Sequence, residues 1–245
     1  MSLIEHLEEL RKRILWSLVF VAVAFFPCWE FKEKIFAFLE RPILNQLPPG
    51  TKLAYTGVVD PFILYFKVAA LAAVFATTPF ILFQIWRFIA PGLYLRERRY
   101  ILPFVFFGTL FFLAGGAFAY YGVFPAALQY LLKLGGGFQP VITIERYFGL
   151  LLALLLGLGL IFELPILIFV ICEIGLVTPG FLLRHYRYAV VIIFIAAAII
   201  TPTPDVLNMC LFALPALLLY LLGIAAAAIS QLRKRRAQET AAAAG

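Results

Sequence analysis

Residues 100–132 read YILPFVFFGTLFFLAGGAFAYYGVFPAALQYLL and contain no charged side chain. A helix needs about 20 apolar residues to cross the hydrocarbon core of a bilayer. Backbone that faces lipid must also satisfy its own hydrogen bonds, which a helix does. This run therefore predicts a membrane-spanning helix. Similar charge-free runs lie on both sides of it, at 14–29, 68–86, 147–162, 188–204 and 206–232.

The composition supports the same class. The chain of 245 residues is 64% hydrophobic and 13% charged, with a mean hydropathy of +1.01. A soluble domain of this size has no core large enough to hide so much apolar surface. The runs are long and continuously apolar rather than alternating, which argues against strands of a membrane barrel. We predict an all-α integral membrane protein.

We expect six transmembrane helices, at roughly 14–31, 65–87, 99–123, 147–173, 187–201 and 206–229, in a single domain covering 1–232. The fifth run is short, because the 14 residues from Arg187 to Ile200 give only about 21 Å of helix. Helices five and six are therefore expected to be the short pair. Residues 233–245, basic and then Ala-rich, are expected to form a cytoplasmic tail, of which the Ala-rich part at 237–245 is expected to be disordered.

The distribution of basic residues predicts the orientation. An even number of spans places both termini on one side, together with the second and fourth loops. Of the 20 Lys and Arg residues, 13 fall on that side and 6 on the other. The excess places both termini in the cytoplasm. The net charge of +7 is then explained by topology and attraction to anionic membrane lipids, and needs no nucleic-acid partner.

Three shorter helices are expected outside the spans. An amphipathic helix should begin near Ser2 and run along the membrane interface into the first span. A second, FKEKIFAFLERP, should be stopped by Pro42. A third should cover Pro125–Leu134 within the third loop and end at the three glycines 135–137.

Two segments on the predicted cytoplasmic face carry acids among bases. They are HLEELRKR at 6–13 and FIAPGLYLRERRY at 88–100. A carboxylate pairs well with a guanidinium group, so the two segments suggest a receptor for a cationic ligand. The alternative is local pairing, of Glu9 with Arg13 and of Glu8 with Lys12 along a helix, and of Glu97 within its own loop.

Glu163 is the one acid well inside a predicted span. A charge there costs several kcal/mol unless it is paired, hydrated or neutralised. We expect Glu163 to face the bundle interior or a hydrated concave surface. The alternative is a protonated carboxyl group that hydrogen-bonds to a neighbouring helix.

Five segments in order carry a family resemblance. They are HLEELRKRI at 6–14, DPFILYFK at 60–67, WRFIAPGLYLRERR at 86–99, FELP at 162–165 and TPTPD at 201–205. Together they resemble TatC, the core subunit of the bacterial twin-arginine protein translocase. The resemblance implies a six-span bundle shaped like a cupped hand in the bacterial cytoplasmic (inner) membrane. It further implies binding of twin-arginine signal peptides of folded cargo proteins, single-span TatA- and TatB-type subunits in a hetero-oligomer, and transport driven by the proton-motive force.

The resemblance also implies roles for particular residues. Two glutamates would contact the arginines of the signal peptide: Glu9 and Glu97. Four residues would shape that site: Arg11, Phe88, Arg98 and Arg99. Three more would be structural or linked to transport: Pro42, Glu163 and Asp205.

Other classes receive less support from the residues. A small-solute or ion secondary transporter, the alternative function, predicts several ionisable groups at mid-membrane, and only Glu163 and Lys67 qualify. An intramembrane enzyme predicts a catalytic constellation within the spans, and none is present in the sequence, so we expect no enzyme. Cys28, Cys172 and Cys210 lack metal-binding spacing, and no Walker-type glycine loop occurs, so we expect no metal and no cofactor.

Overall fold

The chain is described here from a computed structural model, which covers residues 3–47, 52–89, 101–137, 141–200 and 206–243. Within these residues the structure is almost entirely helical, and its β structure is limited to one isolated parallel bridge between Ala54 and Thr143. This confirms the all-α prediction. Five segments of the described chain are long and apolar enough to cross a membrane: Ile4–Glu30, Asp60–Ile89, Leu102–Leu134, Ile144–Glu173 and Met209–Lys234. The apolar helix at Tyr186–Ile199 is shorter, so the count of six spans stays a prediction.

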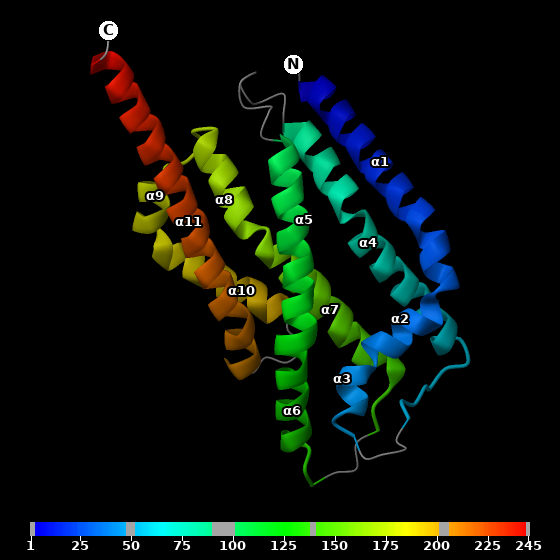
Figure 1. Cartoon of the computed structure of the whole chain (residues 1–245). Coiled ribbons are helices and arrows are strands. Elements are labelled where there is room, and N and C mark those ends of the chain that lie inside the picture. Colours follow the sequence, from blue (N-terminus) through cyan, green and yellow to red (C-terminus); the bar gives the residue numbers. More distant parts are fainter. Residues whose placement is uncertain (1–2, 48–51, 90–100, 138–140, 201–205, 244–245) are drawn as a thin grey trace.

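The first helix, α1 (Leu3–Glu30), lies at one side of the bundle and runs along α4 (Asp60–Ile89), as Figure 1 shows. The expected amphipathic stretch and the first span form this one continuous helix. Aromatic rings pair the two helices along much of their length. Phe20 stacks on Phe80 with ring centroids 4.9 Å apart, and Phe25 lies 5.0 Å from Phe66.

Two short helices, α2 (Lys32–Leu39) and α3 (Arg41–Leu44), cap the end of the bundle opposite to the start of α1 (Figure 1). Here the expectation about Pro42 was wrong. The helix α2 ends at Leu39, and Pro42 lies in the first turn of α3, where a missing N–H costs no helical hydrogen bond. Burial raises the pKa of the Glu40 carboxyl group between these two helices.

The cap is fixed to the spans by two tyrosines. The Tyr147 hydroxyl donates a hydrogen bond to the Leu39 carbonyl oxygen at 2.7 Å, and the Tyr120 hydroxyl donates to the Phe38 carbonyl. Both acceptors lie in the last turn of α2, whose carbonyl groups have no partners within the helix. The cap is thus anchored by hydrogen bonds as well as by apolar contacts.

The third span was predicted to end at 123, with a separate helix beyond it. Instead α5 (Ile101–Phe118) passes through a π-helical turn at Ala119–Val123 into α6 (Phe124–Leu134) without a break. Pro125 stands in the first turn of α6, where the π-helical turn absorbs the register change that the proline requires. The helix ends before Gly135, as expected.

The fourth span is broken in the middle. Helix α7 (Ile144–Phe162) ends at Glu163, and α8 (Leu164–Glu173) begins directly after it with Pro165 in its first turn. The predicted continuous span at 147–173 missed this break. Helix α7 also supplies the centre of the core: Phe148, Leu151, Leu154 and Leu158 are fully buried.

Close approach of α5 to α7 requires a small residue. A Cβ atom on Gly115 would lie 2.7 Å from the Leu158 carbonyl oxygen and 2.9 Å from the Phe162 Cβ atom. Small residues let membrane helices pack with their backbones close together. Gly115 therefore sets the spacing of the central pair.

The remaining helices are α9 (Pro179–Arg184), α10 (Tyr186–Ile200) and α11 (Val206–Ala243). Helix α10 is short, as expected, but α11 is the longest helix described, so the expectation of a short sixth helix was wrong. The expectation of disorder at 237–245 was also wrong for its described part, because α11 continues to Ala243. Most residues at 233–243 are Ala or Arg, which are strong helix formers.

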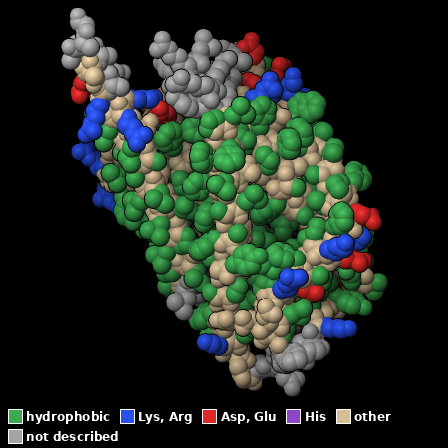
Figure 2. Space-filling model, in the orientation of Figure 1, with side chains coloured by type: hydrophobic (Ala, Val, Ile, Leu, Met, Phe, Trp, Pro, Cys, Tyr) green, Lys and Arg blue, Asp and Glu red, His purple; other side chains and the backbone are tan. Residues whose placement is uncertain are grey.

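The start of α1 and the end of α11 lie at the same end of the molecule (Figure 1). In Figure 2 hydrophobic side chains cover the middle of the visible face, and Lys and Arg side chains lie at its upper corners and on its lower part. This arrangement fits a protein that crosses a bilayer with its charged ends outside the hydrocarbon core.

Candidate functional site

The described part of the expected receptor site lies where the first turns of α1 meet the last turns of α4. The rings of His6 and Phe88 are stacked there, with centroids 4.4 Å apart and planes inclined by 22°. This contact holds the N-terminal segment of α1 against the end of α4. Phe88 was expected in the site, whereas sequence reasoning gave His6 no role there.

One helical turn further along α1, a polar chain connects the two helices. A guanidinium nitrogen of Arg13 donates to the Glu9 Oε1 atom at 2.9 Å, and the other terminal nitrogen donates to Gln84 Oε1 at 3.4 Å. The side chains of Glu9 and Arg13 are mostly buried, with 17% and 16% exposed. Gln84 is buried in α4 and was missed, although it is the only amide within the run 68–86.

The other oxygen of Glu9 has no partner. Its Oε2 atom is buried and makes no hydrogen bond to any described residue, and the Arg13 Nε atom is likewise unbonded. A buried acceptor without a partner costs about 1–3 kcal/mol. The Glu9 carboxylate is thus positioned by Arg13 through one oxygen and retains acceptor capacity on the other.

The structure discriminates between the local pairs considered above. The pair of Glu9 with Arg13 is formed, so the local alternative for Glu9 describes a real contact. Among the described residues the ion pairs are this one and Lys234–Glu173, so the expected pair of Glu8 with Lys12 is absent. Arg11 is exposed on α1, on the side of Glu8 and Lys12.

Four predicted site residues lie outside the described residues: Glu97, Arg98, Arg99 and Asp205. The structure therefore places Glu9 and Phe88 at the junction of α1 and α4, while Arg11, two residues beyond Glu9, is exposed on another side of α1. Pro42 is buried in the cap at the opposite end. The pairing of Glu9 with Glu97 stays a prediction.

Glu163 lies at the break between α7 and α8 and is buried, with 8% of its surface exposed. Glu163 therefore does not lie on an open surface, although a hydrated concave surface was one of its two expected positions. Its carboxylate lies against α5, since a Cβ atom on Gly108 would be 3.2 Å from its Oε2 atom. The Oε1 atom has no hydrogen-bond partner among the described residues. The expected interior position is thus found.

A second polar cluster on the same end of the molecule was not predicted. Glu173 at the end of α8 accepts a hydrogen bond from the Ser230 hydroxyl at 3.3 Å and forms an ion pair with Lys234. The Gln231 amide donates to the Cys172 carbonyl at 3.3 Å. These contacts attach the long helix α11 to α8. Each oxygen of Glu173 has a partner on α11, whereas only one oxygen of Glu9 has a partner among the described residues.

The fold and the site define a multi-pass membrane protein with a polar recognition end. The apolar helices supply the membrane domain, and the junction of α1 and α4 holds a positioned carboxylate, one oxygen of which accepts no hydrogen bond from a described residue. Hydrogen bonds between a carboxylate and a charged donor are stronger than those between neutral groups, so this carboxylate is suited to a cationic ligand.

Comparison with known proteins gives the family. The model of the Sec-independent protein translocase protein family, TatC, matches residues 5–215. The chain is 48% identical to the TatC protein of Koribacter versatilis over 244 residues, covering 98% of this chain and 90% of the relative. It is 36% identical to the TatC protein of Desulforapulum autotrophicum, covering 97% of this chain and 88% of the relative.

Solved structures agree. The fold is similar to a crystal structure of the twin-arginine translocase receptor TatC in the detergent DDM, with a TM-score of 0.81 and 34% identity. That likeness covers 89% of this chain and 97% of the solved one. The chain belongs to the TatC family, and its role is that of a Sec-independent protein translocase component.

Proposed function

We propose that this protein is the signal-peptide receptor of a twin-arginine translocase, with Glu9 and Glu97 forming its acidic binding site. The observation that carries the proposal is the Glu9 carboxylate, which Arg13 holds in place while its Oε2 atom has no partner among the described residues. A ligand guanidinium that donates to this oxygen would complete its hydrogen bonding.

The chemistry explains a preference for two arginines. A guanidinium group presents five N–H donors in a planar fork and pairs with a carboxylate in two parallel hydrogen bonds, whereas a lysine ammonium is a strongly hydrated point charge. Two adjacent arginines on a peptide therefore call for two carboxylates. Arg11, Phe88, Arg98 and Arg99 complete the proposed site around them.

The proposal includes an orientation and partners. The end with the start of α1 and the end of α11 faces the cytoplasm, and the protein resides in the bacterial cytoplasmic membrane. It acts with single-span TatA- and TatB-type subunits on folded cargo, driven by the proton-motive force and without enzymatic chemistry of its own. The positive-inside distribution of Lys and Arg supports the orientation. Pro42, Glu163 and Asp205 contribute to structure or to the transport step.

The test crosses receptor variants with two peptides. Binding of signal peptides carrying Arg-Arg or Lys-Lys is measured to the detergent-solubilised protein and to its Glu9→Ala, Glu97→Ala and Glu8→Ala variants. A charged hydrogen bond contributes about 1.5–3 kcal/mol. Loss of Glu9 or Glu97 should therefore weaken Arg-Arg binding by roughly 10- to 150-fold. Glu8 is exposed and unpaired on the same helix, which makes Glu8→Ala the matched control.

A further variant separates a direct role from an indirect one. Arg13→Gln removes the internal partner of Glu9 but leaves the negative charge of Glu9 in place. It should therefore weaken binding less than Glu9→Ala does. Thermal unfolding in detergent checks that each variant is folded. The proposal fails if Glu97→Ala binds the Arg-Arg peptide like the unmodified protein, or if Glu8→Ala is as damaging as Glu9→Ala.

A further inference from the structure

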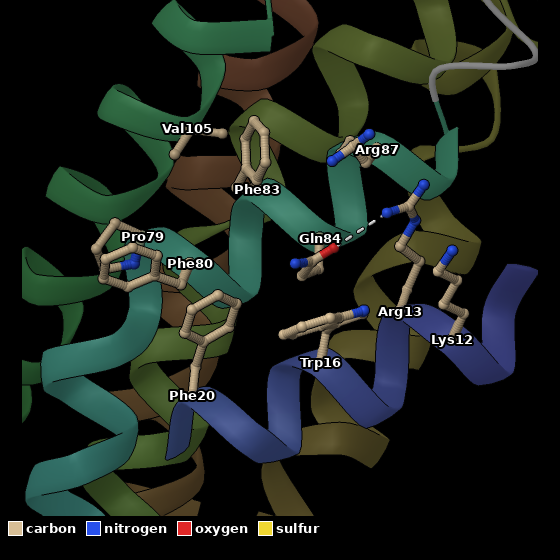
Figure 3. Close-up of a pocket in the computed structure, with 10 residues that line it drawn as sticks. All are labelled: Lys12, Arg13, Trp16, Phe20, Pro79, Phe80, Phe83, Gln84, Arg87 and Val105. Carbon is tan, nitrogen blue, oxygen red and sulfur yellow. Dashed lines mark hydrogen bonds between the residues drawn. The ribbon is translucent and has the colours of Figure 1, made fainter. Parts of the chain in front are cut away.

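A groove of about 750 Å³ lies between α1 and α4, next to the receptor site but on the membrane side of it. Its lining changes character along its length, as Figure 3 shows. Lys12, Arg13 and Arg87 stand at one end. Aromatic rings line the other end, with Phe20 beside Phe80 and the indole of Trp16 between them and the cations.

The polar end is suited to an anion. Three cations line it, and no acid is found among the described residues that line the groove. Glu9 compensates part of the charge of Arg13, but Lys12 and Arg87 are exposed and form no ion pair with a described residue. The Arg87 guanidinium lies 5.9 Å above the ring of Phe83, which keeps it at the groove. These charges repel a twin-arginine peptide, so the groove is a different kind of site from the acidic one.

The apolar end is suited to a hydrocarbon chain. Phe20 stacks on Phe80 with ring centroids 4.9 Å apart, and the ring centroids of Trp16 and Phe20 are 6.3 Å apart. Phe20 lies about 12 Å along α1 from Lys12, since eight residues of helix separate them, and the rings of Trp16 and Phe83 lie nearer to the cations. None of the most apolar 18-residue window of α1 is buried inside the molecule, so the groove is flanked by lipid-facing surface.

Together the two ends match one ligand. We propose that this groove binds an anionic diacyl phospholipid from the leaflet that surrounds the start of α1. Its phosphate lies among Lys12, Arg13 and Arg87, and one acyl chain runs along Trp16, Phe20 and Phe80. A soluble phosphate would leave the aromatic end unused. Basic pockets at the ends of membrane helices are suited to anionic headgroups, and Trp is enriched at this depth. The inference does not rest on the proposed peptide site, although Arg13 belongs to both.

The test uses Trp16 as a local reporter. The chain has three tryptophans, so Trp29→Phe with Trp86→Phe leaves Trp16 alone in the full-length protein. Delipidated protein in detergent is titrated with phosphatidylglycerol or phosphatidylcholine brominated on the acyl chains, and quenching of Trp16 fluorescence is recorded. Phosphatidylglycerol should quench at lower concentration, and the preference should shrink as salt is added.

Charge variants then test the polar end. Lys12→Gln with Arg87→Gln should raise the phosphatidylglycerol midpoint by about 30-fold, which is about 2 kcal/mol at 1.4 kcal/mol per tenfold. Lys12→Arg with Arg87→Lys keeps both charges and should keep the preference. Arg184→Gln with Arg236→Gln removes two exposed cations outside the groove and should leave the midpoint unchanged.

Several results would overturn the proposal. Equal quenching by the two lipids in the parent protein would exclude an anionic site. A neutral double variant that still prefers phosphatidylglycerol would show that Lys12 and Arg87 do not select this lipid. A charge-keeping variant that loses the preference would show that positive charge at these two positions is not what selects it. Displacement of the lipid by glycerol 3-phosphate at equal concentration would indicate a soluble phosphate site instead. Thermal unfolding with and without lipid confirms that each variant is folded.

Discussion

Helix α1 and the pair α7–α8 are both apolar enough to span a bilayer, but they occupy opposite environments. None of the most apolar window of α1 is buried inside the molecule, against 56% of the corresponding window in Ile144–Glu173. The first therefore faces lipid or partners along much of its surface, while the second is the centre on which the other helices pack. Hydropathy predicts which segments cross the membrane, and a helix's place in the bundle depends on small residues and shape.

The largest effect is expected at the closest contact of the central pair. Gly115→Val on α5 would drive a side chain into the Leu158 carbonyl group and Phe162. Overpacking lowers the free energy of unfolding by about 1–3 kcal/mol, and by more where backbone must move, as at the Leu158 carbonyl. We expect loss of most folded protein, measured by monodispersity in detergent. Gly149→Val on α7 is the control, since nothing lies within 4 Å of a Cβ there. Equal damage by both changes would contradict the role of Gly115.

The contrast between the helices can be tested with one substitution type. Leu154→Ala removes a side chain on α7 that is 1% exposed, whereas Leu18→Ala changes one on α1 that is 59% exposed. The cavity left by the first should cost about 2–5 kcal/mol of unfolding free energy. The second should cost far less in the isolated protein. Denaturant titration in mixed micelles measures the unfolding free energy of both variants. Similar losses of this free energy would show that α1 is more enclosed than the exposure of Leu18 indicates.

At the break between α7 and α8, stability and transport should respond in opposite directions. Glu163→Leu removes a buried oxygen that has no partner, so it should stabilise the fold by about 1–3 kcal/mol. If Glu163 has a role in transport, the same change should lower transport more than Glu163→Gln, which keeps hydrogen bonding.

The matched acid is Glu173, which has partners in Ser230 and Lys234. Glu173→Leu should destabilise the protein, because it leaves Lys234 without its carboxylate. Melting temperature and export of a reporter cargo are the two measurements. A destabilised Glu163→Leu variant would contradict the expected stabilisation, and a variant that exports like the parent protein would count against the transport role.

The smallest effect is expected at the start of α7. Tyr147→Phe removes the hydrogen bond to the Leu39 carbonyl and should cost about 0.5–1.5 kcal/mol. Faster proteolysis of the cap α2–α3 would accompany it. Tyr121 is 71% exposed, so Tyr121→Phe should change neither quantity. An unchanged melting temperature for Tyr147→Phe would show that the cap is held by apolar contacts alone.

The sequence predicted the helical class and the apolar segments well, because charge-free runs of this length have one solution in lipid. The break at Glu163 was missed because a proline is compatible with a first helical turn, so Pro165 marks a boundary only when the bundle requires one. The continuity through Ala119–Val123 was missed for the converse reason: a helix was expected to begin at Pro125, but a proline in a first turn does not require a boundary there. The helical end of α11 follows from alanine's propensity, which was given too little weight.

The candidate site was predictable in part. Glu9 and Phe88 were identified from motifs, and both lie at the junction of α1 and α4. The bond from Arg13 to Gln84 joins residues 71 positions apart, and no local pattern encodes the register of two helices that meet so far apart in the chain. The groove beside it was missed for the same reason, since both its cations and its aromatic rings are divided between α1 and α4.

The length of α10 has a consequence for the membrane itself. Its 15 residues give about 22 Å of helix, while the hydrocarbon core of a typical bilayer is about 30 Å thick. A helix too short for the core is accommodated by tilting of neighbours or by local thinning of the lipid. Adding about six leucines to α10 would restore about 9 Å, and unchanged export would remove thinning as an explanation. Where the bilayer beside α10 is thinned, less further deformation would make it permeable, and the mechanical work of opening a passage at that place would be lower.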